Sequence, residues 1–153
     1  MRTSHRKASH QKRKFQADPS SIYKLMGRVQ LFTREERTSL ALPVRLAFES
    51  VKSGQAVRDD FDILAAMANI CMVRSEDVDP LCVETAQRGQ EALMRCLRRH
   101  EATGRWGFDG IAMQEVEIVI DLYEQLLELS TPQQMKEAML TVIERTNARE
   151  VLQ

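Results

Sequence analysis

DGIAMQEVEIVIDLYEQLLELSTP, residues 109–132, is the stretch that decides the fold of this chain. Its apolar residues recur every three or four positions, as in an α-helix with one wide apolar face. They are Ala112, Met113, Val116, Val119, Ile120, Tyr123, Leu126 and Leu127. Such a helix lies at the centre of a bundle or meets a second subunit. The pattern therefore predicts a helix over 110–129 and leaves open a homodimer.

Prolines that directly follow a capping residue mark the start of three helices, at Asp18-Pro19, Asp79-Pro80 and Thr131-Pro132. Proline at the first helical position loses no backbone hydrogen bond, and the preceding side-chain oxygen accepts from free amides of the first turn. Two capping boxes, Thr33-x-x-Glu36 and Thr131-x-x-Gln134, add to these signals. With the apolar spacing they predict helices over 19–30, from 34 onward, and over 56–74, 80–102, 110–129 and 132–148.

The helix that starts at 34 contains Pro43, which removes an amide and clashes with the preceding turn. We therefore expect this helix to kink or break near Leu42. The chain has 153 residues, of which 43% are hydrophobic and 29% charged, as in one ordinary globular domain. The sequence predicts an all-α fold, a compact bundle of about five to six helices, with residues 17–153 as a single domain.

The net charge of zero hides an asymmetry between the N-terminal segment and the rest of the chain. Residues 17–153 hold 16 of the 22 Lys and Arg residues and all 22 acidic residues, a formal charge of −6. Residues 1–16 form a basic arm that we expect to be disordered. It either binds nucleic-acid phosphates or acts as a solubilising tail that docks on the acidic body. Its candidate nucleic-acid-binding residues are Arg2, Arg6, Lys7, Lys12, Arg13 and Lys14.

A second basic zone lies at the end of the helix over 80–102 and in the glycine-rich loop after it. Arginine and tryptophan concentrate binding energy at interfaces because each offers a large contact area. In the alternative interpretation, basic residues stabilise a helix C-terminus and the aromatic residues fill the core. The candidate partner-binding residues are Arg95, Arg98, Arg99, Arg105, Trp106 and Phe108.

Two further helical patterns each have competing interpretations. Four carboxylates share one face of the helix over 110–129: Glu117, Asp121, Glu124 and Glu128. They form a solvated face, a docking strip for a basic partner or for the arm, or an acid–base or metal site. The methionines, eight in all, either fill gaps in the core or line a groove for a partner helix.

Catalytic and metal-binding patterns have little support. Cys96 and His100 are one helical turn apart, but two ligands do not make a metal site. Di-metal helical bundles need Glu-x-x-His, and none of the three histidines stands three residues after a glutamate. The nucleophile-elbow, phosphate-loop and zinc-protease motifs are also missing. We therefore expect no metal, no cofactor and no enzyme activity.

Cysteine usage and hydropathy bear on the compartment of the protein. Cys71, Cys82 and Cys96 are an odd number, lie in helical patterns and share no Cys-x-x-Cys spacing, so a disulfide framework is not expected. No apolar run is long enough for a membrane span, and the N-terminus does not resemble a signal peptide. These features predict a cytoplasmic protein that does not bind membranes.

The stretch TGRWGFDG, residues 103–110, is followed by the helix to Leu129 and by Thr131-Pro132-x-x-Met135. This pattern resembles small uncharacterised helical proteins carried by proteobacterial phages and plasmids. The resemblance covers residues 103–135 and carries no functional residue. It implies a mobile-element setting, in which short proteins often bind and redirect a host machine, including inhibitors of CRISPR and other defence complexes.

These observations favour a non-enzymatic interaction protein of a mobile genetic element, one that binds and modulates or inhibits a host protein or nucleoprotein complex. The basic arm and the second basic zone, on an otherwise acidic body, would attract the partner electrostatically. The alternative is a nucleic-acid-binding accessory or regulatory protein that uses the basic arm and the arginine-rich helix.

Overall fold

Side-chain oxygens cap the first turn of four of the five helices in the computed structural model, which describes residues 30–148. The caps are Thr33, Asp79, Asp109 and Thr131, and the backbone N–H of Ala112, for example, donates to Asp109 Oδ1 at 2.7 Å. The helices are α2 (Arg34–Lys52), α3 (Arg58–Ser75), α4 (Pro80–Thr103), α5 (Gly110–Leu129) and α6 (Pro132–Asn147).

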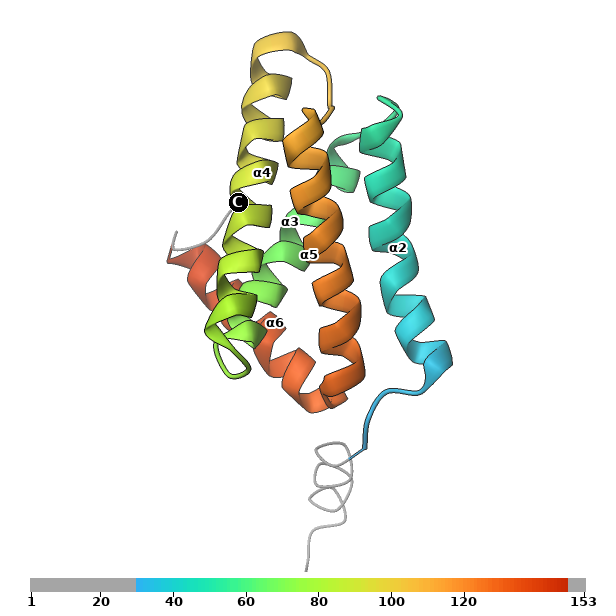
Figure 1. Ribbon diagram of the computed structural model, residues 1–153, viewed down its shortest axis with the longest axis vertical. Coiled ribbons are helices and arrows are strands. Elements are labelled where there is room, and N and C mark those ends of the chain that lie inside the picture. The colour runs from blue at the N-terminus through green and yellow to red at the C-terminus, as the bar shows by residue number, and fades with distance from the viewer. Residues whose placement is uncertain (1–29, 149–153) are drawn as a thin grey trace, which may run out of the picture.

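These bounds confirm the all-α prediction, since residues 30–148 contain five helices and no strand (Figure 1). Helix α2 begins at the predicted residue 34, and both ends of the other four described helices lie within two residues of the predicted ones. The helix expected over 19–30 and the basic arm over 1–16 lie outside the described residues.

A kink or a break was predicted near Leu42, and the structure shows that there is no break. Helix α2 runs without interruption from Arg34 to Lys52 and includes Pro43. Proline has no N–H, so the carbonyl of Ser39, four residues earlier, has no helical hydrogen-bond donor. Both Pro43 and Ser39 are exposed. The carbonyl can therefore be hydrated by water, so the outer face of the helix tolerates the proline.

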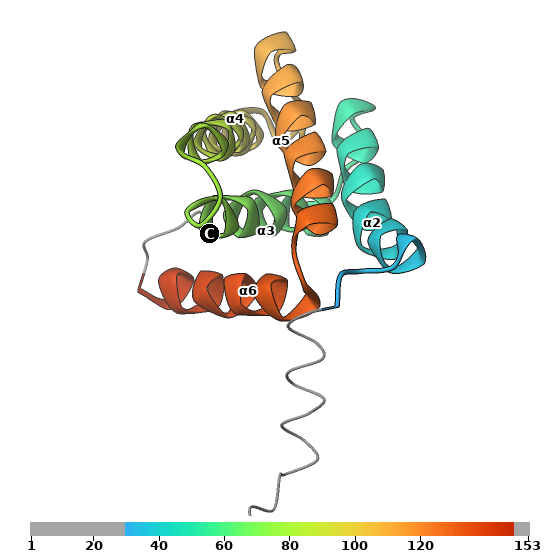
Figure 2. The ribbon, with the colours of Figure 1, turned by 60° about the horizontal axis from the view of Figure 1, so that its bottom comes forward.

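Helix α3 lies in the middle of the bundle and packs against each of the other four helices. Figure 2 shows it between α6 on one side and the layer of α4, α5 and α2 on the other. Ten of its 18 residues are buried, because neighbours cover it on several sides. Helix α5 packs against α2, α3 and α4, so the wide apolar face seen in the sequence is filled largely within one chain.

A glycine sets how closely α4 approaches α5. A Cβ placed on Gly89 would lie 2.7 Å from Cγ1 of Val119, a distance that real side chains do not adopt. The backbone of α4 at Gly89 therefore packs directly against the side chain of Val119 on α5.

The methionines within residues 30–148 do not gather on one surface. Met67 and Met135 are buried, and Met72 and Met113 pack at the edge of the core. Met139 is exposed on α6. Most of these side chains therefore fill gaps between helices, as methionine commonly does. No helix among the described residues is long and apolar enough to cross a membrane.

Candidate functional site

The loop between α4 and α5 places the residues predicted to bind a partner. Gly104 closes α4 in the left-handed conformation, with φ of 73°, and its N–H donates to the carbonyl of His100 at 2.7 Å. Only glycine adopts this conformation without strain. Asp109 then caps α5, so the five residues between helix and cap form a short, well-anchored turn.

Trp106 is part of the hydrophobic core. Its side chain is 8% exposed and packs in the main cluster of buried residues. Its ring stacks on His100 at a centroid distance of 3.7 Å and on Phe61 at 4.9 Å. Two rings stacked this closely on one face would overlap, so His100 and Phe61 cover opposite faces. Phe108 is half-buried and stacks on Phe48 at 5.6 Å. Of the two interpretations of these aromatic residues, the structure favours core packing.

The arginines of α4 and of the loop after it fall into two groups, and those of the first group pair with acidic residues of the chain. Arg95 Nη2 lies 2.7 Å from Glu115 Oε2, and its Nε lies 3.6 Å from Asp109 Oδ2. The hydrogen bond with Glu115 raises the pKa of Arg95. Arg88 pairs with Glu84 one turn before it, at 3.8 Å. Arg95 is therefore largely committed to holding α4 against the start of α5.

The second group is unpaired. Arg98, Arg99 and Arg105 are exposed, and their guanidinium groups form no ion pair or hydrogen bond with any residue between 30 and 148. Arg98 and Arg99 lie in the last turns of α4, and Arg105 follows the Gly104 cap. A partner that binds these three cations would not have to break a contact within the described part of the chain.

An open pocket of about 530 Å³ lies between this loop and the end of α2. Figure 1 shows the ends of α2 and α4 beside the start of α5, at one end of the molecule. Of residues 30–148, three cations and no carboxylate line the pocket. Its lining residues are Val51, Lys52, Ser53, Gly54, Arg99, Thr103, Arg105, Trp106, Gly107 and Phe108. We call Lys52, Arg98, Arg99 and Arg105 the basic end.

Lys52 was not among the residues predicted from the sequence. It closes α2, and Gly54 turns the chain away from it with φ of 75°. Among residues 30–148, its Nζ has one loose acidic neighbour, Glu49 Oε1 at 3.7 Å. A lysine in the last turn of a helix is common, because it stabilises the negative end of the helix dipole, so in the sequence Lys52 gave no sign of a binding site. Only the packing of α2 beside the α4–α5 loop brings it close to Arg99 and Arg105.

Helix dipoles oppose these cations in part. Both α2 and α4 end at the pocket, and each helix C-terminus carries about half a negative charge. Basic residues at such ends stabilise the helices, as one interpretation of the sequence holds. Lys52, Arg99 and Arg105 bring three positive charges to two helix ends, so the surface keeps a net positive charge.

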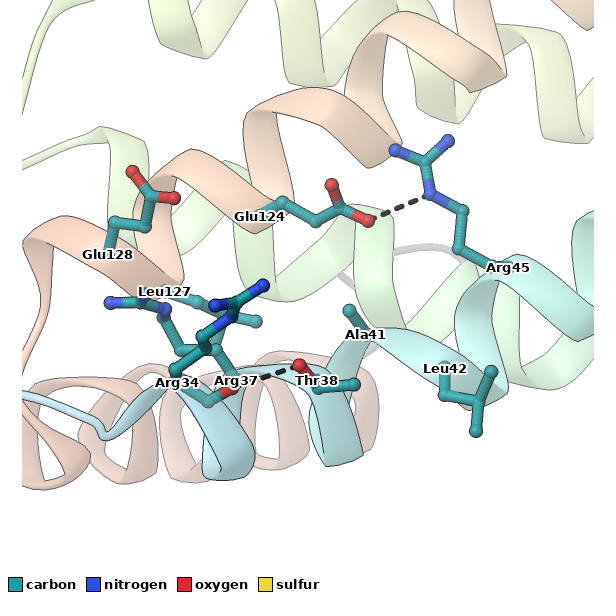
Figure 3. A pocket seen from close by; sticks show the side chains of 9 residues that line it. All are labelled: Arg34, Arg37, Thr38, Ala41, Leu42, Arg45, Glu124, Leu127 and Glu128. Carbon is teal, nitrogen blue, oxygen red and sulfur yellow. Dashed lines mark hydrogen bonds and ion pairs between the residues drawn. The ribbon is translucent and has the colours of Figure 1, made fainter.

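The carboxylates of α5 are partly neutralised by a residue from α2. Arg45 Nε lies 2.8 Å from Glu124 Oε1, and its Nη2 lies 2.8 Å from Asp121 Oδ1. The hydrogen bond with Glu124 is the main cause of a raised pKa of Arg45. Figure 3 shows Arg45 reaching Glu124 at the edge of a second pocket, of about 370 Å³. Three arginines and two glutamates line this pocket, so cations and carboxylates are mixed there.

The described residues offer little for nucleophilic or metal chemistry. Cys71 and Cys96 are buried, and burial raises the pKa of both thiols, which disfavours the reactive thiolate. His100 lies flat against Trp106 and is partly buried. Within residues 30–148, no group of three or more His, Cys, Asp or Glu side chains is placed to hold a metal ion.

Similarity to other proteins adds no constraint. No family model, curated protein or solved structure matches the chain. The geometry and charge of the basic end therefore carry the functional interpretation.

Proposed function

We propose that this protein is a non-enzymatic binding protein that engages a negatively charged surface of a host protein or nucleoprotein complex through the basic end. The observation that carries the proposal is the set of three exposed arginines, Arg98, Arg99 and Arg105, without partners in residues 30–148. Such a cluster on an acidic body attracts and orients an acidic partner. In this proposal the protein modulates or inhibits the complex that it binds.

The paired groups of the same region define what holds the surface in place. Arg95 fastens α4 to Glu115 and Asp109, and Trp106 fixes the loop to the core between Phe61 and His100. These residues therefore position the basic end. Because Trp106 is buried, its contribution to binding is indirect.

The setting of the proposal is the cytoplasm of a bacterium that carries a mobile element. The resemblance of residues 103–135 to proteins of phages and plasmids supports the mobile element. All three cysteines are free, and two of them are buried, which suits a reducing compartment.

Affinity purification of the tagged full-length chain from its source organism tests the proposal. The test variant carries Arg98→Glu, Arg99→Glu and Arg105→Glu. A matched control reverses three other cations that form no ion pair within residues 30–148, as Arg34→Glu, Arg37→Glu and Lys136→Glu. Both variants change the net charge by −6, so the charge of the whole molecule is the same in both.

We expect the wild type and the control to recover the same partner and the test variant to lose it. Equal recovery by all three proteins, or recovery of no partner by the wild type, would overturn the proposal. The alternative from the sequence, a nucleic-acid-binding accessory protein, uses the same cations. In that case, nuclease treatment would release everything that the wild type recovers.

A further inference from the structure

We infer that the 530 Å³ pocket at the basic end binds a backbone phosphate of a nucleic acid and does not read the bases. This inference rests on the proposed function, because the cations that line the pocket belong to the basic end. It goes further by naming the chemical group that the pocket receives and the component of the partner that supplies it.

The cations reach the pocket from three separate segments. Lys52 comes from the end of α2, Arg99 from the last turns of α4, and Arg105 from the loop after Gly104. A phosphate accepts hydrogen bonds on several oxygens at once, so donors from three directions suit it better than they suit a planar carboxylate. The volume of the pocket is typical of ligand sites and leaves room for a sugar beside the phosphate.

No carboxylate from the described part of the chain lines the pocket to repel an anion. Glu49 lies 3.7 Å from Lys52, Asp109 and Glu115 pair with Arg95, and Glu101, two residues after Arg99 on α4, is not part of the pocket lining. The pocket between α2 and α5 differs, because two carboxylates, Glu124 and Glu128, line it together with its arginines and would repel an anion. An anion therefore favours the basic end.

Hydrogen bonds within the loop hold the cations in place. Thr103 Oγ1 donates to the carbonyl of Arg99 at 2.7 Å and accepts from the N–H of Arg105 at 3.3 Å. Ser53 Oγ donates to the carbonyl of Ser50 at 3.1 Å. Both hydroxyl groups that line the pocket, those of Ser53 and Thr103, therefore already donate to backbone carbonyls. Charge, and not hydroxyl hydrogen bonding, provides the affinity for an anion.

The aromatic residues of the pocket offer little surface for a base. His100 and Phe61 cover the two faces of Trp106, and Phe48 covers one face of Phe108. Proteins that stack bases need an open aromatic face. Binding through the pocket is therefore expected to depend on phosphate charge and to show little dependence on nucleotide sequence.

The test measures binding of the full-length protein to labelled single-stranded DNA of random sequence, by fluorescence anisotropy over a range of salt concentrations. The test variant is Lys52→Gln, Arg99→Gln and Arg105→Gln. The control removes three charges elsewhere, as Arg34→Gln, Arg37→Gln and Lys136→Gln. The basic arm is present in every protein, so its contribution is common to all of them.

We expect the test variant to lose roughly five- to eightfold in affinity per cation at about 0.1 M salt. The slope of log affinity against log salt should fall by about 2, or about 0.7 for each lost contact. Trp106 is the only tryptophan and lies in the pocket wall. DNA should therefore change its emission in the wild type and in the control, but not in the test variant.

An unchanged affinity and salt slope in the test variant would overturn the inference. So would equal binding of polyglutamate of matched length with the same dependence on the three cations, because the pocket would then recognise any anion. Neither result touches the proposed function. That proposal fails if the wild type captures no partner, or if the reversal of Arg98, Arg99 and Arg105 leaves the captured partner in place.

Discussion

Replacement of Trp106 by alanine should remove much of the stability of the protein. The side chain is 8% exposed and is stacked between His100 and Phe61. A buried tryptophan removes about 150–250 Å² from water, which at about 25 cal/mol per Å² corresponds to about 4–6 kcal/mol. The Cβ that alanine retains and residual burial in the unfolded chain reduce this value. We expect a loss of about 3–5 kcal/mol, which is a large fraction of the stability of a domain this size.

Urea denaturation of the full-length chain measures this loss. Unfolding is followed by circular dichroism, because the variant has no tryptophan to report by fluorescence. Ile111→Ala, at a residue that is 68% exposed, serves as the control and should change the free energy of unfolding by less than about 0.5 kcal/mol. Trp106→Phe keeps an aromatic ring in the stack and should lose less than the alanine variant. An alanine variant within about 1 kcal/mol of wild type would refute the assignment of Trp106 to the core.

Two further predictions concern contacts between helices. Gly89→Ala should lower the free energy of unfolding by about 1–2 kcal/mol in urea denaturation, because forced separation from Val119 outweighs the better helix propensity of alanine. Gly110→Ala, where a Cβ meets no atom, should be neutral, and equal effects of the two would contradict this reasoning. Glu76→Gln should cost up to about 1 kcal/mol at pH 7, because the hydrogen bond from Arg145 lowers the pKa of Glu76 below its ordinary 4.5. That stabilisation is complete above pH 4.5 and is lost as the pH falls through the lower folded-state pKa, so wild type and variant should converge in acid, and a constant difference would count against the ion pair.

Local chemistry explains why the helices could be predicted from the sequence. Thr33, Asp79 and Thr131 cap the helices that they were expected to cap, since capping depends on a side chain and the first turn that follows it. Pro43 shows where local reasoning stops. Whether a proline breaks a helix depends on which face it occupies, and the structure puts it on the solvent side of α2.

The candidate site was only partly predictable. The sequence identified residues 95–108 as one zone. It could not show that Arg95 is paired while the other arginines are not, because its partner Glu115 is 20 residues away in the chain. Lys52 joins the site through packing of helices that are far apart in sequence. Such long-range contacts leave no periodic signal, so the sequence could locate the basic zone but not the pocket.

The central claim is that the unpaired arginines of the basic end, and not the buried tryptophan, contact the partner. Partner capture by the Trp106→Phe protein and by the Arg98→Glu, Arg99→Glu, Arg105→Glu protein tests it most directly, once circular dichroism shows that both are folded. We predict that Trp106→Phe retains the captured partner and that the triple charge reversal loses it. Loss of the partner in the folded Trp106→Phe protein, with retention in the charge-reversed protein, would contradict the claim.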